Sequence, residues 1–438
     1  MKKKFLILSV LLAVSTVFSL SCNRAGIQTS QAHNVKRQPL NWYDDLVFED
    51  ENLSFQLART IGWTYSGGAD IGECIRTARA IRAGDIYSWY SEWLKTANRL
   101  YAFAEQMQKE GDTVSAREAY FRASKYYRTS GFYMHAKDNR PKALETWQLS
   151  RDSFLKAIAS LPYINQIEIP YEDTTLPGYF IKAPAEKAPL LIVHTGFDGT
   201  AEELYFAVGL AAHKRGYNCL LFEGPGQGEV IRLQNLPYRY DWEKVVAPVI
   251  DYALTIPEVD KDQIALMGIS MGGYLAPRAA AFDYRIKACI ANGGIFDFSE
   301  NIFNEFPPEE IKLIETNPEE FNHIVYKVME ENITVNWFFT DGMWTFHANS
   351  PAELMQLLKK YTLKNVVERI KCHMLIVDSE NDQFEKGQAR KLYDKLQSPK
   401  KYILFTREEA AQTHCQIGAV AISNEVVFSW LNDVFDRR

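Results

Sequence analysis

The sequence predicts an α/β fold: a doubly wound, mostly parallel β-sheet with an N-terminal helical domain and a helical cap insertion. After residue 165, short β-rich runs alternate with helical stretches, which is the pattern of a parallel sheet. Several runs are continuously apolar, as expected for strands that helices cover on both faces. The predicted strands lie at residues 167–171, 178–181, 190–194, 219–222, 264–267, 288–291, 374–377 and 402–405.

Two helical stretches lie outside this alternation. Residues 44–164 are helical in pattern with almost no strand signal, so we predict a helical domain there and the sheet domain at 165–438. Residues 296–369 are again helical and separate two predicted strands. We predict that they form a cap over the C-terminal edge of the sheet, where open α/β sheets bind ligands. Thr200 and Glu203 have the spacing of a capping box at a helix start.

The N-terminus has the layout of a secretory signal. Three lysines precede an uncharged run that is shorter than the ~20 apolar residues needed to span a bilayer. The run ends Ser-Leu-Ser-Cys, which resembles a bacterial lipoprotein signal, where the cysteine is lipidated. We therefore expect a signal peptide at 1–21, a lipidated Cys22 and a tether at 22–43. The expected location is the bacterial cell envelope, facing the periplasm or the surface, with a soluble secreted or periplasmic protein as the alternative.

Composition limits the partners and cofactors. The formal net charge of −6 gives no reason to expect nucleic acid, which calls for basic patches. Beyond Cys22, an odd number of irregularly spaced cysteines predicts neither a disulfide framework nor a zinc site, and we expect no metal. We expect a small-molecule substrate, and membrane contact only through a lipid anchor at Cys22. The sequence leaves the oligomeric state open, with a homodimer as one option.

A nucleophile motif lies at residues 268–273, Gly-Ile-Ser-Met-Gly-Gly. It follows a predicted strand and precedes a helical run, which is the context that a G-x-S-x-G nucleophile elbow requires. Glycines flank the serine because the turn is too tight for neighbouring Cβ atoms. We therefore predict Ser270 as the nucleophile, and the alternative is a chance glycine-rich turn.

A serine nucleophile needs a general base and an acid, expected in the chain order Ser, Asp, His. His414 lies in a loop between the last predicted strand and the C-terminal helix, and we predict it as the base. His373, at the start of a predicted strand, is interpreted as structural. Asp378 and Asp382 both follow that strand. We favour Asp382, which lies farther into the loop, as the residue that orients the imidazole.

An oxyanion hole needs two N–H groups directed at the developing charge. We predict the N–H of Met271, the residue after the nucleophile, and that of Phe197 in the loop after the third predicted strand, with Gly196 as the second option. The Gly-Pro-Gly-Gln-Gly run at 224–228 lacks the features of a phosphate loop, so we interpret it as a turn that shapes the cleft. Cys415 is interpreted as a packing residue.

Several short motifs occur together: Gly-Gly-Ala-Asp at 67–70, Ser-Trp-Tyr-Ser-Glu-Trp at 88–93, Ile-Pro-Tyr-Glu at 169–172, Leu-Pro-Gly-Tyr at 176–179, Gly-Phe-Asp-Gly-Thr at 196–200, Glu-Gly-Pro-Gly-Gln-Gly-Glu at 223–229 and His-Cys-Gln at 414–416. With them, residues 45–435 resemble one branch of the α/β hydrolases, the fermentation–respiration-switch-like esterases and dihydropseudooxynicotine hydrolase. Glu223 stands where the branch usually has Asp.

The resemblance implies a helical domain that closes over the active site with the cap, no cofactor, and hydrolysis of esters or of C–C bonds beside a carbonyl. It also supports Ser270, Asp382 and His414 as the triad. We therefore predict a serine hydrolase of small molecules that works through an acyl-enzyme. The alternatives are an acyl or aminoacyl peptidase and a catalytically silent, ligand-binding lipoprotein.

Overall fold

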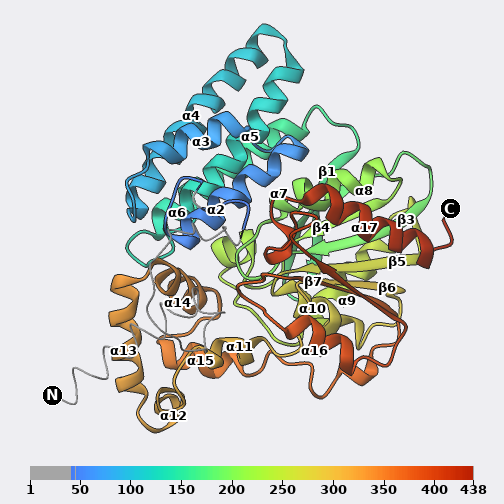
Figure 1. The fold of residues 1–438 in the computed structure, drawn as a ribbon. Helices are drawn as coiled ribbons and strands as arrows, with labels where there is room; N and C mark the ends of the chain where they lie inside the picture. Colours follow the sequence, from blue (N-terminus) through green and yellow to red (C-terminus); the bar gives the residue numbers. More distant parts are fainter. Residues whose placement is uncertain (1–40, 45, 438) are drawn as a thin grey trace, which may run out of the picture.

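The computed structural model describes residues 41–44 and 46–437, and Figure 1 shows their arrangement. The predicted signal peptide at 1–21, Cys22 and most of the predicted tether at 22–43 lie outside the described residues. Three parts are visible: an N-terminal helical group, a β-sheet with helices on both faces, and a second helical group between two strands of the sheet.

An eight-stranded sheet forms the centre of the largest part. Its strands are β1 (Ile164–Tyr171), β2 (Thr174–Ile181), β3 (Ala188–His194), β4 (Asn218–Phe222), β5 (Val259–Ile269), β6 (Ala288–Asn292), β7 (His373–Ser379) and β8 (Lys400–Phe405). Their order is β1-β2-β4-β3-β5-β6-β7-β8. β2 is antiparallel to β1 and β4, and all the other neighbours are parallel. The predicted strands and the mostly parallel sheet are therefore confirmed.

Helices cover both faces of this sheet. Along β3, Leu190 and Ile192 belong to the core on one face, and Leu191 and Val193 belong to the core on the other, because successive strand side chains point in opposite directions. α9 (Glu243–Ala253), α10 (Gly272–Ala280) and α16 (Gln388–Lys395) pack on the first face, and α7 (Ala201–Leu204), α8 (Leu210–Lys214) and α17 (Val420–Val434) on the second.

The N-terminal helical group consists of α2 (Glu51–Gly62), α3 (Ile71–Ala80), α4 (Ile86–Glu110), α5 (Thr113–Gly131) and α6 (Arg140–Ile158). Asp50, Asp70, Asp85 and Asp112 each begin one of the first four helices and accept backbone N–H groups of its first turn, as N-cap residues do. The domain boundary predicted at residue 164 falls where α6 has ended and β1 begins, and the extent of each domain stays a prediction.

The second helical group lies between β6 and β7, within the stretch predicted to form a cap. Its helices are α11 (Phe298–Asn304), α12 (Pro308–Thr316), α13 (Pro318–Glu331), α14 (Ile333–Thr345) and α15 (Pro351–Leu358). α14 meets the N-terminal helical group (Figure 1): Trp337 stacks on Phe132 with ring centroids 5.4 Å apart, and Asp341 Oδ1 lies 2.6 Å from His135 Nδ1.

Buried ion pairs join α2 and α5 to the loop and helix that follow β3. The carboxylate of Glu203 lies 2.9 Å from Arg59 Nη2, from Lys125 Nζ and from Arg128 Nε. The predicted capping box of Thr200 and Glu203 is wrong, because these cations hold the Glu203 carboxylate and the Thr200 side chain accepts no capping hydrogen bond. Although burial raises the pKa of Glu203, the three cations hold it below the ordinary value.

Glu203→Gln should lower the free energy of unfolding by about 3–5 kcal/mol, because it leaves buried cations without their counter-charge. Glu315→Gln is the matched control. Glu315 pairs with Lys359 at the surface, and exposed pairs contribute about 0–1 kcal/mol. Urea denaturation of both variants measures the difference. Equal, small losses in the two variants would contradict the role assigned to Glu203.

Candidate active site

Ser270 lies in a tight turn between β5 and α10. Its φ of 61° is in the left-handed region, and its N–H donates to Asn292 O over 2.8 Å. A Cβ at Gly268 would lie 1.9 Å from Gly272 O, and a Cβ at Gly273 would lie 2.0 Å from Gly293 O. Only glycine fits at these positions, so the sequence motif and the turn require each other.

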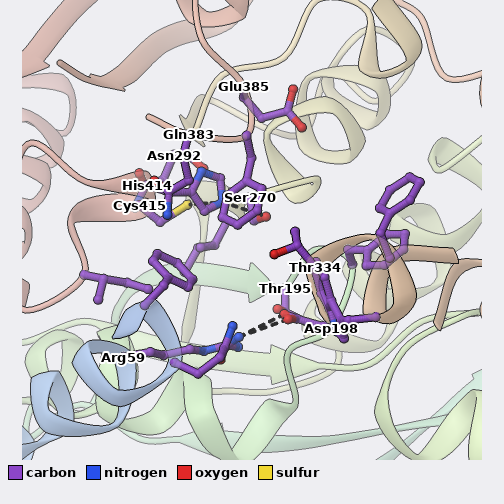
Figure 2. A pocket seen from close by; sticks show the side chains of 18 of the residues that line it. Arg59, Thr195, Asp198, Ser270, Asn292, Thr334, Gln383, Glu385, His414 and Cys415 are labelled. Atoms are coloured by element: carbon purple, nitrogen blue, oxygen red, sulfur yellow. Dashed lines mark hydrogen bonds and ion pairs between the residues drawn. The ribbon is translucent and has the colours of Figure 1, made fainter. Parts of the chain in front are cut away.

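The structure brings Ser270, His414 and Asp382 together. His414 Nε2 lies 2.9 Å from Ser270 Oγ, and His414 Nδ1 lies 2.8 Å from Asp382 Oδ2 (Figure 2 shows Ser270 and His414). The other oxygen of Asp382 accepts the N–H groups of Phe384 and Glu385 over 2.9 and 2.8 Å. Because the carboxylate can only accept, Nδ1 carries the proton and Nε2 is left to accept the Ser270 hydroxyl.

Asp378, the other candidate for the acid, does not reach His414. Its carboxylate accepts the Tyr402 hydroxyl over 2.6 Å and the N–H of Ser379 over 2.8 Å. His373 is exposed at the start of β7, away from Ser270. The geometry therefore favours Asp382 over Asp378, because the loop after β7 turns only the later carboxylate toward the imidazole.

Charge and burial act in opposite directions on His414. Burial disfavours the charged imidazolium, but the nearby Asp382 carboxylate raises the pKa of His414 well above its ordinary value. For Asp382, burial raises the pKa, and the neighbouring His414 outweighs it, so that this pKa is lowered. The two groups therefore stabilise each other in their charged forms.

The loop after β3 passes directly against the turn that holds Ser270. A Cβ at Gly196 would lie 2.6 Å from Met271 N and 3.0 Å from Ser270 Cβ. The predicted oxyanion residues, Phe197 and Met271, are thus next to this contact: Phe197 follows Gly196, and Met271 precedes the first turn of α10. The side chain of Phe197 points toward the cap, where it stacks on Phe338 at 5.5 Å.

Side chains in and near the glycine-rich run at 224–228 hold this loop in place. Gln227, in the glycine-rich run, donates to Thr195 O over 2.8 Å, and the Tyr238 hydroxyl donates to Gly196 O. Glu223 accepts the N–H groups at the start of α7 and at residue 229, so its carboxylate has a structural role. Burial raises the pKa of Glu223 to about 8. The sequence marks the Gly-Pro-Gly-Gln-Gly run and Glu223, whereas nothing in the sequence points to Tyr238.

The helical group contacts the same loop through arginines. Arg59 Nη1 donates to both carboxylate oxygens of Asp198 over 3.1 Å, and Arg128 Nη2 donates to Asp198 O over 3.2 Å. Asp198 directly follows Phe197. Side chains of α2 and α5 therefore determine where the backbone at Phe197 lies, and Figure 2 shows the Arg59–Asp198 pair at the edge of the pocket.

An apolar cavity of about 270 Å³ adjoins Ser270 and His414. The helical group, the loop after β3, the cap and the loop after β7 all contribute to its wall, for example through Phe55, Phe197, Ile302, Trp337, Phe338 and Phe384. Cys415 also lines it, with Sγ 3.4 Å from His414 Nε2, so its thiol faces the site instead of only packing. Within residues 41–44 and 46–437, no group of His, Cys, Asp or Glu side chains is arranged to hold a metal ion.

A solved structure shares this architecture. The crystal structure of the 2,6-dihydroxy-pseudo-oxynicotine hydrolase superposes with a TM-score of 0.66, covering 85% of this chain and 95% of that chain at 20% identity. The likeness extends over the helical group as well as the sheet. The α/β-hydrolase fold and the resemblance to this branch, both predicted from the sequence, are confirmed.

Curated relatives match almost the whole chain. The 20-hydroxy-prefusarin hydrolase FUS2 of Gibberella moniliformis is 34% identical over 410 residues, which cover 89% of this chain and 98% of the relative. The hydrolase LUC6 of a Fusarium species is 32% identical over 413 residues, which cover 90% and 98%. These alignments include both the helical group and the sheet part.

The predicted location in a bacterial cell envelope is wrong, because these relatives are fungal hydrolases and not bacterial envelope lipoproteins. The prediction rested on four residues ending at Cys22 and on a short apolar run, a pattern too brief to specify lipidation, and Cys22 lies outside the described residues. None of the helices in the described part of the chain has the length and apolar character needed to cross a membrane.

A family model gives the same assignment as the relatives. The model of the alpha/beta hydrolase family matches residues 190–415, from β3 to the loop that carries His414. This range contains Ser270, Asp382 and His414. Together with the identity to the fungal hydrolases over about nine-tenths of the chain, this match shows that the chain is a hydrolase that belongs to the α/β hydrolase family.

Proposed function

We propose that this hydrolase cleaves an ester, or a C–C bond next to a carbonyl, in a small molecule through an acyl-enzyme on Ser270. The observation that supports the proposal most strongly is the continuous series of contacts from Ser270 Oγ through His414 to Asp382, at the wall of an apolar cavity. Nucleophile, base and orienting acid in this geometry are what acyl transfer requires.

In the proposed mechanism, Ser270 Oγ attacks the substrate carbonyl while His414 Nε2 takes its proton. The N–H groups of Phe197 and Met271 stabilise the oxyanion of the tetrahedral intermediate. The intermediate then expels the leaving group, and His414 gives it the proton, at oxygen for an ester or at carbon for a ketone. Water attacks the acyl-enzyme with His414 as base, which releases the acid and restores Ser270.

Cavity size and lining support a small, largely apolar substrate. The volume of about 270 Å³ is near the lower end of ligand pockets, and aromatic side chains from four parts of the chain enclose it. The relative from Gibberella is named for 20-hydroxy-prefusarin, a small molecule. An acyl or aminoacyl peptidase is a weaker proposal, because the cavity wall is largely apolar and aromatic and its arginine, Arg59, is already paired with Asp198 and Glu203.

Ser270→Ala should reduce turnover of p-nitrophenyl acetate by more than about 1,000-fold, because a triad nucleophile acts as a unit with its base. Cys415→Ala is the matched control, since its thiol also lies near His414 Nε2, and it should retain activity within about tenfold. A fluorophosphonate probe should label the wild type and Cys415→Ala but not Ser270→Ala. Retained turnover in Ser270→Ala would contradict the proposed nucleophile and the hydrolytic role of this site.

Asp382→Asn should lower kcat by about 10⁴, because an amide no longer fixes the tautomer of His414. Asp378→Asn should leave kcat nearly unchanged and reduce stability, since Asp378 accepts the Tyr402 hydroxyl. Ester turnover and thermal unfolding of the two variants separate these effects. The reverse pattern would assign the acid to Asp378.

On acidification, ester hydrolysis should be lost at a higher pH than an ordinary histidine base would give. His414 must be neutral to act as base, and Asp382 raises its pKa, so kcat/KM should fall as pH drops through a midpoint above the ordinary histidine value of about 6.5. In Asp382→Asn the midpoint should move to lower pH. A pH profile of kcat/KM for both proteins measures this, and a wild-type midpoint at or below that of the variant would oppose the prediction.

A further inference from the structure

Glu385 places a carboxyl group with one buried, unpartnered oxygen in the wall of the cavity. The residue is only 6% exposed and lines the cavity beside His414, and its Oε2 is buried without a hydrogen-bond partner among the described residues. In Figure 2, Glu385 lies on the side of Ser270 and His414 that is opposite to Arg59 and Asp198. It therefore faces a different part of the cavity from the proposed oxyanion site.

The structural task at this position does not need the Glu385 side chain. The backbone N–H of Glu385 holds Asp382 Oδ1 over 2.8 Å, and any residue other than proline has this group. A buried carboxyl oxygen without a partner reduces folding stability, so an apolar residue would serve the fold better. The fold and the triad therefore give no reason for a carboxyl side chain at this position, and a ligand in the cavity is a partner that the unpaired oxygen lacks.

The surroundings of Glu385 favour its uncharged form. Burial, and then the negative charge of Asp382, raise its pKa well above the ordinary value for glutamate. A neutral carboxyl group offers one O–H donor and one acceptor oxygen. It therefore complements an uncharged group that can both accept and donate a hydrogen bond, which describes a hydroxyl.

The other polar groups in the cavity wall point to the same chemistry. Gln56, Asn292, Glu305 and Gln383 also line the cavity, and each has a buried side-chain oxygen without a partner in the described part of the chain. The arginine in the wall, Arg59, is already paired with two carboxylates. Unpartnered oxygens favour hydrogen-bond donors, and a paired arginine offers little to an anion.

We propose that Glu385 is a substrate-binding residue that selects uncharged, largely apolar substrates with a hydroxyl group away from the scissile carbonyl. This inference rests on the proposed function, because it places the scissile carbonyl at Ser270 Oγ and the substrate hydroxyl at Glu385, another point of the same cavity wall. The hydroxyl would fill the unmet hydrogen-bonding capacity of Glu385, and the aromatic wall would bind the rest of the molecule.

Isosteric pairs of p-nitrophenyl esters test the proposal. The two esters of a pair differ only at the chain end, where one has CH₂OH and the other CH₂CH₃, as in 6-hydroxyhexanoate and heptanoate. The series covers acyl chains of four to nine carbons. The ratio of kcat/KM for the hydroxyl ester to that for its methyl partner is measured within one protein, so that general losses of activity cancel. For at least one chain length, the ratio measured in Glu385→Leu should be roughly ten- to a hundredfold lower than the ratio measured in the wild type.

Two variants serve as controls. Glu385→Gln keeps the shape and the hydrogen-bonding groups, and its ratio should stay within about threefold of the wild type. Glu310 in α12 is another buried glutamate that has an unpartnered oxygen, but it lies outside the cavity wall. Glu310→Leu should therefore leave the ratio unchanged. Thermal unfolding shows whether Glu385→Leu folds, and we expect it to be at least as stable as the wild type.

Failure of this inference and failure of the proposed function give different results. If Ser270 is labelled by a fluorophosphonate but no hydroxyl ester turns over, or the ratio is unchanged in Glu385→Leu, the role of Glu385 is refuted and the serine hydrolase remains. An equal shift in Glu310→Leu would also refute it. If Ser270 is not labelled and no ester is hydrolysed, the proposed function fails and the substrate inference fails with it.

Discussion

The carboxylates of Asp198 and Glu203 compensate the charge of buried cations where the helical group meets the sheet part, and much of the structure depends on these ion pairs. Arg59 contacts both carboxylates, and Arg128 also reaches the backbone of Asp198. Because Phe197 directly precedes Asp198, the same contacts that join the two parts also locate the loop beside Ser270. A change in this ion cluster would therefore affect stability and the geometry of the site together, since buried cations without counter-charges are strongly unfavourable.

The turn at Ser270 shows how local strain is supported by its surroundings. A non-glycine residue at positive φ is costly, and such conformations persist only where the surrounding structure holds them. Here the N–H of Ser270 is held by Asn292 O, and glycines at 268 and 273 allow β5, α10 and the following strand to approach closely. The strain places Oγ at the cavity wall, 2.9 Å from His414 Nε2, where it can meet a substrate.

The cavity combines an apolar wall with a few polar groups whose pKa values are shifted by burial and by neighbouring charges. The cap and the helical group meet through Trp337 and Phe132. Asp382, Glu385 and His414 are all buried at this site, and electrostatic interactions between buried groups are stronger than in water. In this setting the imidazole partner lowers the pKa of Asp382, whereas burial raises the pKa of Glu385, three residues later. Two carboxyl groups of one loop thus acquire different chemistry from their surroundings alone, the first suited to orienting a base and the second to binding a neutral group.

The sequence by itself determined the strands and the turn around Ser270, because hydrophobic periodicity and turn chemistry are short-range properties. It favoured Asp382 over Asp378 from the position in the loop alone, since both follow the same strand, and the contacts of Asp378 with the Tyr402 hydroxyl and of Asp382 with His414 agree with that choice. It was wrong about Glu203 for the same reason: the capping-box spacing is local, whereas the cations that hold this carboxylate lie on helices far away in the chain. Ion pairing, burial and the direction of a carboxylate are decided by residues that only the tertiary structure brings together.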